Sequence, residues 1–451
     1  MEGPEFLSGV IEGFYGRPWS FEQRATLLSR LRAFGFNTYV YAPKDDIKLR
    51  THWRESYGER ELGQLAALVQ TCHDAGLRFV YSISPGLDVS YGDAADLAWL
   101  IGKVDQLLAL GVHDVALLLD DIPDELGTDD RKRFDSLAAA QGHLAEALFE
   151  HLREVSPEGR KLLGPTIYCR RMADQHRVGW EYLRELGGLL GADVDVFWTG
   201  DEVVSESVDA ASLADVSEAL GRPPLLWDNL HADDYDLRSV YLGPYSGRSA
   251  DLPAATRGIL TNPNGPFQLN EVAFATLAAF LRDPDGYRPE SALGNALAHW
   301  HSSFGLLGGD VLSTDELWLL AELFYLPWRC GPGVQAILDE AQAALSSAPD
   351  AGDGRLARVD GLAKDVHRLF ERLAQLRDRE LFYSLHGVAL EARRESRVLA
   401  DYLLHRAEHG AEARFGRPDQ LPNTYRRGFA AAVHHMLPLS ADGSLAVRAA
   451  T

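Results

Sequence analysis

The stretch Ala116-Leu-Leu-Leu-Asp-Asp-Ile-Pro123 is an apolar run that leads directly into two adjacent carboxylates. A run that is apolar at successive positions, rather than at alternate ones, is typical of a parallel strand covered on both faces. The stretch therefore predicts a buried parallel strand, with Asp120 and Asp121 at its carboxyl end.

Seven further apolar runs of this kind occur within the first 290 residues. The eight predicted strands are residues 7–12, 38–42, 78–82, 114–119, 162–167, 195–198, 224–227 and 258–260. Amphipathic helix patterns separate most of them, and the first begins with a capping box formed by Ser20 and Gln23. The other patterns are residues 59–75, 94–110, 130–155, 178–190, 208–220 and 270–281, and no clear helix follows Asp228.

Eight strand–helix alternations match the usual size of a (β/α)8 barrel, about 250 residues. The alternative is a doubly wound open sheet, which usually carries a glycine-rich phosphate turn after its first strand. That position reads Glu12-Gly-Phe-Tyr-Gly-Arg-Pro-Trp19, which is not that fingerprint. The sequence therefore predicts an α/β fold with a TIM-like barrel catalytic domain over residues 1–285. Beyond a turn-rich break, helix signals predict a stalk-like α-helical bundle over residues 290–451, including a helix over residues 317–326 that Ser313 and Glu316 cap.

The composition narrows the function classes. The chain has 451 residues, with 44 Lys and Arg against 66 Asp and Glu, a formal net charge of −22. This surplus of acids argues against general binding to nucleic acid or anionic membranes, and no apolar run reaches the ~18 residues of a membrane helix. Residues 1–8 lack the cationic segment of a secretory signal, and three cysteines without metal-ligand spacing suit a reducing compartment. We expect a cytoplasmic protein without a bound metal.

In such barrels the chemistry lies at the carboxyl ends of the strands. Acids, amides, one lysine and aromatic residues follow the predicted strands, a mixture that suits a sugar better than a phosphate or a metal. The adjacent pair Asp120 and Asp121 is the clearest feature. Because two like charges in one site cannot ionise independently, one carboxyl is expected to keep its proton while the other is charged.

Each of these residues also has a purely structural interpretation. Asp121 or Asp124 could cap the next helix, and Lys44 could lie in a solvated charge cluster. The others would serve packing or turns: Trp198, Trp227, Tyr168, Asn262 and Asn264. The convergence of polar strand ends on one rim favours the functional interpretation of the two aspartates, whereas packing and function remain equally open for the tryptophans.

Several blocks of sequence resemble glycoside hydrolase family 84, which includes the O-GlcNAcases that remove β-linked N-acetylglucosamine from serine and threonine. The blocks are Glu12-Gly-Phe-Tyr-Gly-Arg-Pro-Trp19, Tyr41-Ala-Pro-Lys-Asp-Asp46, Ser82-Ile-Ser-Pro-Gly-Leu-Asp88, Leu119-Asp-Asp-Ile122, Trp198-Thr-Gly200, Trp227-Asp-Asn-Leu-His-Ala-Asp-Asp-Tyr-Asp236 and Leu260-Thr-Asn-Pro-Asn264. The resemblance continues more thinly into residues 315–327, which look like the helical stalk of that family.

The resemblance implies roles for individual residues. Asp120 would orient the 2-acetamido N–H, Asp121 would be the general acid and then the general base, and Tyr168 would bind the acetamide carbonyl. Sugar hydroxyls would be held by the Gly13 carbonyl, Lys44, Asp234 and Asn262. Asn229 would support the Asp120 side of the pocket, Trp227 would wall the acetamide, and Val203 would contact the aglycone.

The adjacency of the two aspartates bears on the mechanism. Most glycosidases place two carboxyls about 5–5.5 Å or about 6.5–9.5 Å apart across the ring, which consecutive residues at one strand end do not readily achieve. Substrate-assisted catalysis removes this difficulty, because the acetamide oxygen attacks C1 and forms an oxazoline, with net retention and no cofactor. The resemblance, together with this chemistry, therefore implies a retaining exo-β-N-acetylglucosaminidase.

Two alternatives remain open at this stage. One is an endo-acting hexosaminidase on a polysaccharide such as hyaluronan, and the other is a sugar-binding barrel without turnover. The expected partners are β-N-acetylglucosaminyl substrates, including glycosylated proteins or peptides, and the resemblance suggests a homodimer formed through the helical domain.

Overall fold

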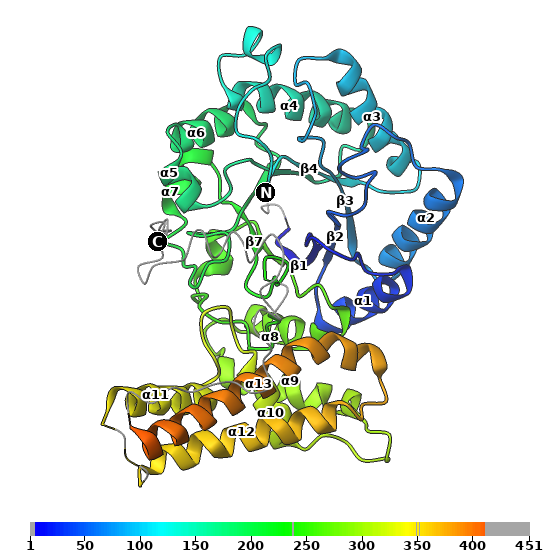
Figure 1. The fold of residues 1–451 in the computed structure, drawn as a ribbon. Coiled ribbons are helices and arrows are strands. Elements are labelled where there is room, and N and C mark those ends of the chain that lie inside the picture. The colour runs from blue at the N-terminus through cyan, green and yellow to red at the C-terminus, as the bar shows by residue number, and fades with distance from the viewer. Residues whose placement is uncertain (1–4, 237–238, 349, 351, 411–451) are drawn as a thin grey trace, which may run out of the picture. The chain divides into compact units, whose positions relative to one another are not determined.

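Eight parallel strands close into a barrel (Figure 1) in the computed structural model, which describes residues 5–236, 239–348, 350 and 352–410. Each strand pairs with the next along the chain, and β8 pairs with β1, which closes the sheet. The strands are β1 (Leu7–Glu12), β2 (Thr38–Tyr41), β3 (Arg78–Ile83), β4 (Asp114–Leu118), β5 (Lys161–Gly164), β6 (Val194–Trp198), β7 (Leu225–Asp228) and β8 (Gly258–Thr261). The predicted barrel is confirmed, and its eight strands differ from the predicted ranges only near their ends.

Helices surround this barrel, as Figure 1 shows. They are α1 (Phe21–Phe34), α2 (Glu59–Asp74), α3 (Ala94–Leu108), α4 (Leu137–Val155), α5 (Arg170–Gln175), α6 (Gly179–Leu189), α7 (Ala214–Leu220) and α8 (Glu271–Arg282). The Ser20 capping box opens α1 as predicted, and Gly35 ends it in the left-handed conformation. Two helices begin later than predicted: α4 starts where the Ser136 side chain accepts a hydrogen bond from the Ala139 N–H at 2.9 Å, and α7 starts at Ala214.

Two layers of apolar side chains explain why the strands are apolar almost throughout. An inner cluster fills the barrel and consists of Leu7, Ile11, Val40, Ala42, Val80, Ala116, Leu118, Leu162, Phe197, Leu225, Trp227 and Leu260. The alternate residues of each strand pack outward, against the helices. Since the barrel interior is filled by side chains, the space for a ligand lies at the carboxyl ends of the strands.

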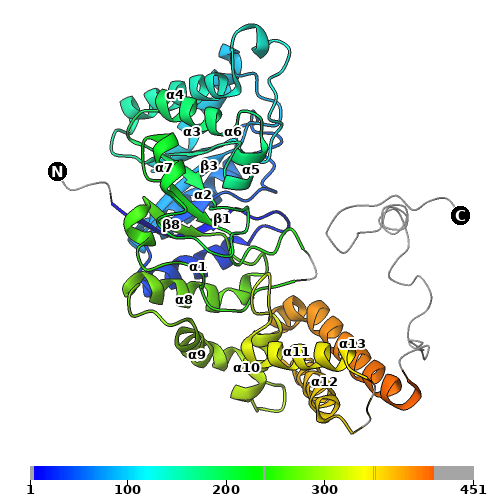
Figure 2. The ribbon, with the colours of Figure 1, turned by 90° about the vertical axis from the view of Figure 1, so that its left-hand side faces the viewer.

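Helices also form the carboxyl-terminal part: α9 (Pro289–Trp300), α10 (Thr314–Leu323), α11 (Pro332–Ser346), α12 (Gly354–Leu373) and α13 (Arg379–His409). In Figure 2, α9 continues the chain from α8 beside the barrel. The capping box of Ser313 and Glu316 opens α10 as predicted, but the helix ends at Leu323, before the predicted end at residue 326.

The described part of the chain divides into two compact units: one holds the residues up to 336 and residues 366–392, and the other holds residues 337–365 and those from 393 on. The second unit has a small apolar core of its own, formed by Ala341, Ala344, Leu356, Val359, Ala363, Ala400 and Leu403. Residues 411–451 of the predicted bundle lie outside the described residues, and the predicted boundary between residues 285 and 290 stays a prediction. In the described part of the chain, no helix combines the length and the apolar character that crossing a bilayer demands.

Candidate functional site

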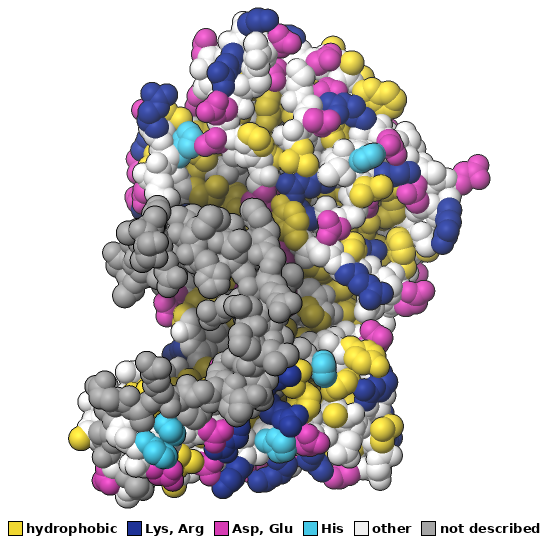
Figure 3. Space-filling model, in the orientation of Figure 1, with side chains coloured by type: hydrophobic (Ala, Val, Ile, Leu, Met, Phe, Trp, Pro, Cys, Tyr) yellow, Lys and Arg dark blue, Asp and Glu magenta, His cyan; other side chains and the backbone are white. Residues whose placement is uncertain are grey.

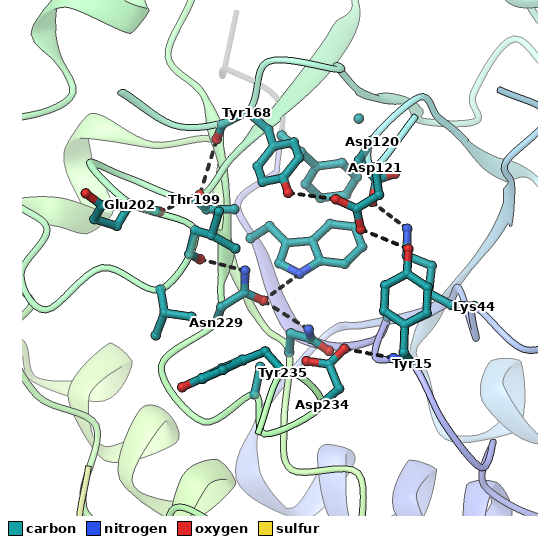
Figure 4. A pocket seen from close by; sticks show the side chains of 18 of the residues that line it. Tyr15, Lys44, Asp120, Asp121, Tyr168, Thr199, Glu202, Asn229, Asp234 and Tyr235 are labelled. Atoms are coloured by element: carbon teal, nitrogen blue, oxygen red, sulfur yellow. Dashed lines mark hydrogen bonds and ion pairs between the residues drawn. The ribbon is translucent and has the colours of Figure 1, made fainter. Parts of the chain in front are cut away.

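A pocket of about 470 Å³ lies at the carboxyl ends of the strands, and all ten residues that the sequence predicts for the site line it. Figure 4 shows most of them with their hydrogen bonds. They are Gly13, Lys44, Asp120, Asp121, Tyr168, Val203, Trp227, Asn229, Asp234 and Asn262. The structure therefore brings together residues from the carboxyl ends of seven different strands.

Asp120 is the deeper of the two adjacent carboxyls. Its side chain is 15% exposed, and its Oδ2 forms an ion pair with the ammonium group of Lys44, which is 2% exposed. Its other oxygen, Oδ1, is buried and has no hydrogen-bond partner within the described structure. A charged carboxylate with one unused oxygen attracts a hydrogen-bond donor, because a buried acceptor without a partner is costly.

Asp121 follows with a backbone φ of +52°, and it is the only described residue other than glycine with a positive φ. Successive residues of an extended strand point to opposite faces. The left-handed turn at Asp121, a conformation that aspartate tolerates better than most residues, breaks this alternation. Both carboxyl groups therefore line the same pocket, although they are consecutive in the chain.

Two tyrosines donate hydrogen bonds to Asp121 from opposite sides, as Figure 4 shows. Tyr15 bonds Oδ2 at 2.9 Å, and Tyr168 bonds Oδ1 at 2.8 Å. Burial, aided by the negative charge of Asp121, raises the pKa of both phenols well above the usual tyrosine value. Both hydroxyls therefore keep their hydrogens, and the carboxylate form of Asp121 has a donor on each oxygen.

Asn229, Trp227 and Asn262 form the floor of the pocket. The Oδ1 of Asn229 accepts hydrogen bonds from Trp227 Nε1 and Asn262 Nδ2, both at 3.0 Å. Its Nδ2 donates to the carbonyl of Val203 at 2.8 Å, so both ends of this amide are hydrogen-bonded, one of them to the loop after β6. Asn262 Oδ1 is a second buried acceptor without a partner in the described structure.

Gly13 allows the tryptophan to reach this position. A Cβ atom at residue 13 would lie 2.3 Å from Cζ2 of Trp227, far inside van der Waals contact. On its other side, the indole packs edge-on against Phe197, with ring centroids 5.2 Å apart. Only glycine fits at residue 13 beside the indole, which assigns Gly13 a packing role in addition to its predicted carbonyl contact.

A buried ion pair supports the floor from behind. Asp228, which ends β7 between Trp227 and Asn229, accepts hydrogen bonds from Arg248 and, at 2.7 Å, from the hydroxyl of Tyr245. These donors hold the pKa of the Asp228 carboxyl below its usual range, although burial alone would raise it. The charged Asp228 therefore fixes the strand end that carries two pocket residues.

Asp234 approaches the pocket from the loop after β7, and its Oδ2 accepts the backbone N–H of Tyr15 at 2.8 Å. Burial raises its pKa. The neighbouring Asp233 lies behind the pocket lining, 7% exposed, and accepts the N–H of Gly265 at 2.8 Å. Burial raises the pKa of Asp233 to about 7.

Several lining residues received no role from the sequence. They include Tyr15, Arg171, Phe197, Thr199, Glu202 and Tyr235. Tyr15 and Tyr235 lie inside blocks that resemble the family, and Arg171 lies three residues after Tyr168. Their closeness in the chain to predicted site residues was the only sequence feature that could have indicated them. Arg171 Nε also forms an ion pair with Glu202 Oε2 at 2.5 Å, which joins two loops. No sequence pattern predicts this contact.

A pair of acids at one strand end of such a barrel, beside an aromatic wall and amides, defines the class of glycoside hydrolases. The chain belongs to the beta-N-acetylglucosaminidase family, whose model matches residues 8–305. The family and the enzyme class that the sequence predicts are thereby confirmed.

The Protein O-GlcNAcases of Mus musculus and Rattus norvegicus are each 42% identical to this chain over 277 residues, which is 61% of the chain and 30% of either relative. The chain thus matches less than a third of the length of these relatives. Among solved structures, a mutant of the Thermobaculum terrenum O-GlcNAc hydrolase superposes with a TM-score of 0.77 at 27% identity. That match covers 89% of this chain and 84% of the solved chain.

Proposed function

We propose that the protein is a retaining exo-β-N-acetylglucosaminidase of the O-GlcNAcase type, which hydrolyses terminal β-linked N-acetylglucosamine through an oxazoline. The observation that carries the proposal is the different setting of two consecutive carboxyls in one pocket. Asp120 is partly buried, is paired with Lys44 and has a buried oxygen without a partner, whereas Asp121 is exposed and held by two phenols. These settings suit one permanently charged group and one group that exchanges a proton.

In the first step, Asp120 receives the acetamide N–H of the substrate on its free Oδ1. This hydrogen bond turns the acetamide oxygen towards C1, and the charge of Asp120 stabilises the positive charge that spreads onto nitrogen as the oxazoline forms. Lys44 forms an ion pair with the other oxygen of Asp120 and so holds this carboxyl in place. Trp227 borders the acetamide and excludes water from it.

Asp121 then acts on the glycosidic oxygen. It donates a proton to the leaving group, and the resulting carboxylate takes a proton from the water that opens the oxazoline. The hydrogen bonds from the two phenols stabilise the deprotonated form of Asp121, which acts in the second step, because each carboxylate oxygen accepts one of them. Tyr168 would turn its hydroxyl to the acetamide oxygen when the sugar binds, which frees Oδ1 of Asp121 for the proton that the first step requires.

The partners follow from the same proposal. The substrates would be glycosylated proteins or peptides, with the aglycone beside Val203. Acidic and basic side chains are interspersed on the barrel face in Figure 3, which does not favour a polyanion such as nucleic acid. We place the activity in the cytoplasm, where the three free thiols Cys72, Cys169 and Cys330 would stay reduced, and a homodimer through the helical part remains part of the proposal.

The test is turnover of 4-nitrophenyl N-acetyl-β-glucosaminide by the full chain, with the anomeric form of the first product followed by proton NMR. The β-anomer should appear first, because two displacements at C1 give net retention. Cleavage of a glycopeptide should release a single sugar, whereas an endo-acting enzyme would release oligosaccharides from hyaluronan. Absence of turnover, or an α-anomer as the first product, would contradict the proposal.

A further inference from the structure

Arg50 lies behind the pocket, outside the set of residues that line it. It is 6% exposed and belongs to the loop after β2. One guanidinium nitrogen, Nη1, donates a hydrogen bond to the hydroxyl oxygen of Tyr15, and the other, Nη2, donates to the backbone carbonyl of Asp121 at 3.0 Å. Within the described part of the chain, no carboxylate forms a salt bridge with this buried cation.

The contact with Tyr15 fixes the direction of a second hydrogen bond. Arginine has donors only, so the oxygen of Tyr15 must accept from Arg50 and point its own hydrogen elsewhere. That hydrogen goes to Oδ2 of Asp121, at 2.9 Å. The guanidinium also lies over the Tyr15 ring, with its central carbon 5.2 Å from the ring centroid, which restrains the ring itself.

The contact with the carbonyl acts on the backbone. Asp121 holds a left-handed conformation with a φ of +52°, which costs energy in a residue with a side chain. A charged donor bonded to its carbonyl oxygen stabilises this conformation. The same guanidinium thus holds both the backbone and a side-chain partner of one carboxyl group.

We propose that Arg50 is a positioning residue, which holds the left-handed backbone of Asp121 and directs the Tyr15 hydroxyl to its carboxyl, so that this group faces the glycosidic oxygen. The proposal rests on the proposed function, in which Asp121 is the general acid and base. Arg50 itself touches no reacting atom. Its loss should therefore impair proton transfer, while the deeper sugar contacts through Asp120 and Asn262 persist.

The experiment compares Arg50→Met, Arg50→Lys and Tyr15→Phe on two N-acetyl-β-glucosaminides, one with a good leaving group (4-nitrophenyl) and one with a poor one (methyl). Misplacement of a catalytic group by about 1 Å costs on the order of 100-fold in rate, so kcat of Arg50→Met on the methyl glycoside should fall by about that factor. On the aryl substrate the fall should be several-fold smaller, because departure of that group needs little acid assistance. KM should change little on either substrate.

The kcat of Arg50→Lys on the methyl glycoside should lie between those of the wild type and Arg50→Met. One ammonium group cannot bond both partners in the fork geometry of arginine. The double variant Arg50→Met, Tyr15→Phe should show a smaller fold-decrease in kcat than the product of the two single decreases, because both residues act on one carboxyl. The matched control is Arg222→Lys, since Arg222 donates to backbone carbonyls of Gly187, Leu190, Gly191 and Val194 and does not line the pocket. Arg222→Lys should lower the melting temperature without changing the ratio of kcat on the methyl glycoside to kcat on the 4-nitrophenyl glycoside.

The possible outcomes separate the two proposals. A wild-type chain that cleaves neither glycoside overturns the proposed function, and the role of Arg50 falls with it. If the wild type is active and folded Arg50→Met loses equal activity on both substrates, or loses only thermal stability as Arg222→Lys does, the role of Arg50 is overturned and the proposed function stands.

Discussion

Asp120 and Asp121 are neighbours in the chain, yet their carboxyl groups bind different partners in the same pocket, Lys44 in one case and two tyrosines in the other. The left-handed turn at Asp121 makes this possible, because an extended backbone would direct the two side chains to opposite faces. In the proposed mechanism, this division of partners gives two identical side chains different chemical tasks.

Replacement of Asp121 by asparagine should act selectively on substrates with poor leaving groups. Asparagine keeps the shape of the side chain but cannot transfer a proton, and general acid–base catalysis contributes about 10²–10⁴-fold. A loss of this order is expected for alkyl glycosides, and a much smaller one for formation of the oxazoline from activated aryl glycosides. Steady-state and pre-steady-state rates on a series of leaving groups measure the effect, and equal losses across the series would remove Asp121 from the acid role.

Fluorination of the N-acyl group should slow the reaction stepwise. Each fluorine withdraws electron density from the carbonyl oxygen, which is the nucleophile in the proposed mechanism. The measurement is kcat/KM on aryl glycosides bearing acetyl, fluoroacetyl, difluoroacetyl and trifluoroacetyl groups. As a control, the same series with Asp121→Asn should retain the dependence, because oxazoline formation from an activated substrate does not need the acid. A kcat/KM that does not change with fluorination would exclude the acetamide as nucleophile.

Gly13→Ala should distort the floor of the pocket. Its new methyl group would lie 2.3 Å from Trp227 Cζ2, so the indole or the loop must move. Overpacking of this kind costs about 1–3 kcal/mol of stability, and the shifted indole should also raise KM. The matched control is Gly102→Ala in α3, where a methyl group would meet no atom within 4 Å and should be neutral or stabilising. Thermal unfolding and kinetics of both variants distinguish a steric effect from a general loss of glycine.

Asp233→Asn should change the pH dependence of stability. Burial raises the pKa of Asp233 to about 7, so the folded protein holds this proton more tightly than the unfolded chain does. The stability from Asp233 is therefore fully present below pH ~4 and is lost as pH rises through ~7. Asparagine removes this loss and can still accept the Gly265 N–H. Relative to the wild type, the variant should gain up to about 1.4 kcal/mol per pH unit over that range, and a difference that is the same at all pH values would contradict the assignment.

The barrel was predictable because a single rule, burial on both faces of each strand, produces eight recognisable apolar runs. The outcome at β5 shows where this rule fails, since the apolar run continues to Ile167 while the strand ends at Gly164. The next residue is Pro165, which lacks the N–H that another ladder bond would need. The late start of α4 has a similar local cause in the Ser136 cap, which competes with helix signals that begin earlier.

The predicted pocket residues follow strand ends, and for that reason the sequence could place them on one rim. Their partners were harder to predict, because they depend on contacts between segments far apart in the chain. The contact of Arg50 with the Asp121 carbonyl joins residues 71 positions apart. Nothing in the local pattern around Arg50 distinguishes it from a solvated arginine, and only the folded loop brings it behind Tyr15.

The apolar side chains that fill the barrel beneath the pocket have a consequence for the order of events in a catalytic cycle. A hexosamine ring seated on Trp227 has no passage through the interior, so entry and departure share one mouth. In the proposed mechanism the leaving group would occupy that mouth, and it would have to depart before hydrolytic water could arrive from the same side. The sugar ring would then be the last component to leave, so the freed monosaccharide should inhibit the next turnover competitively.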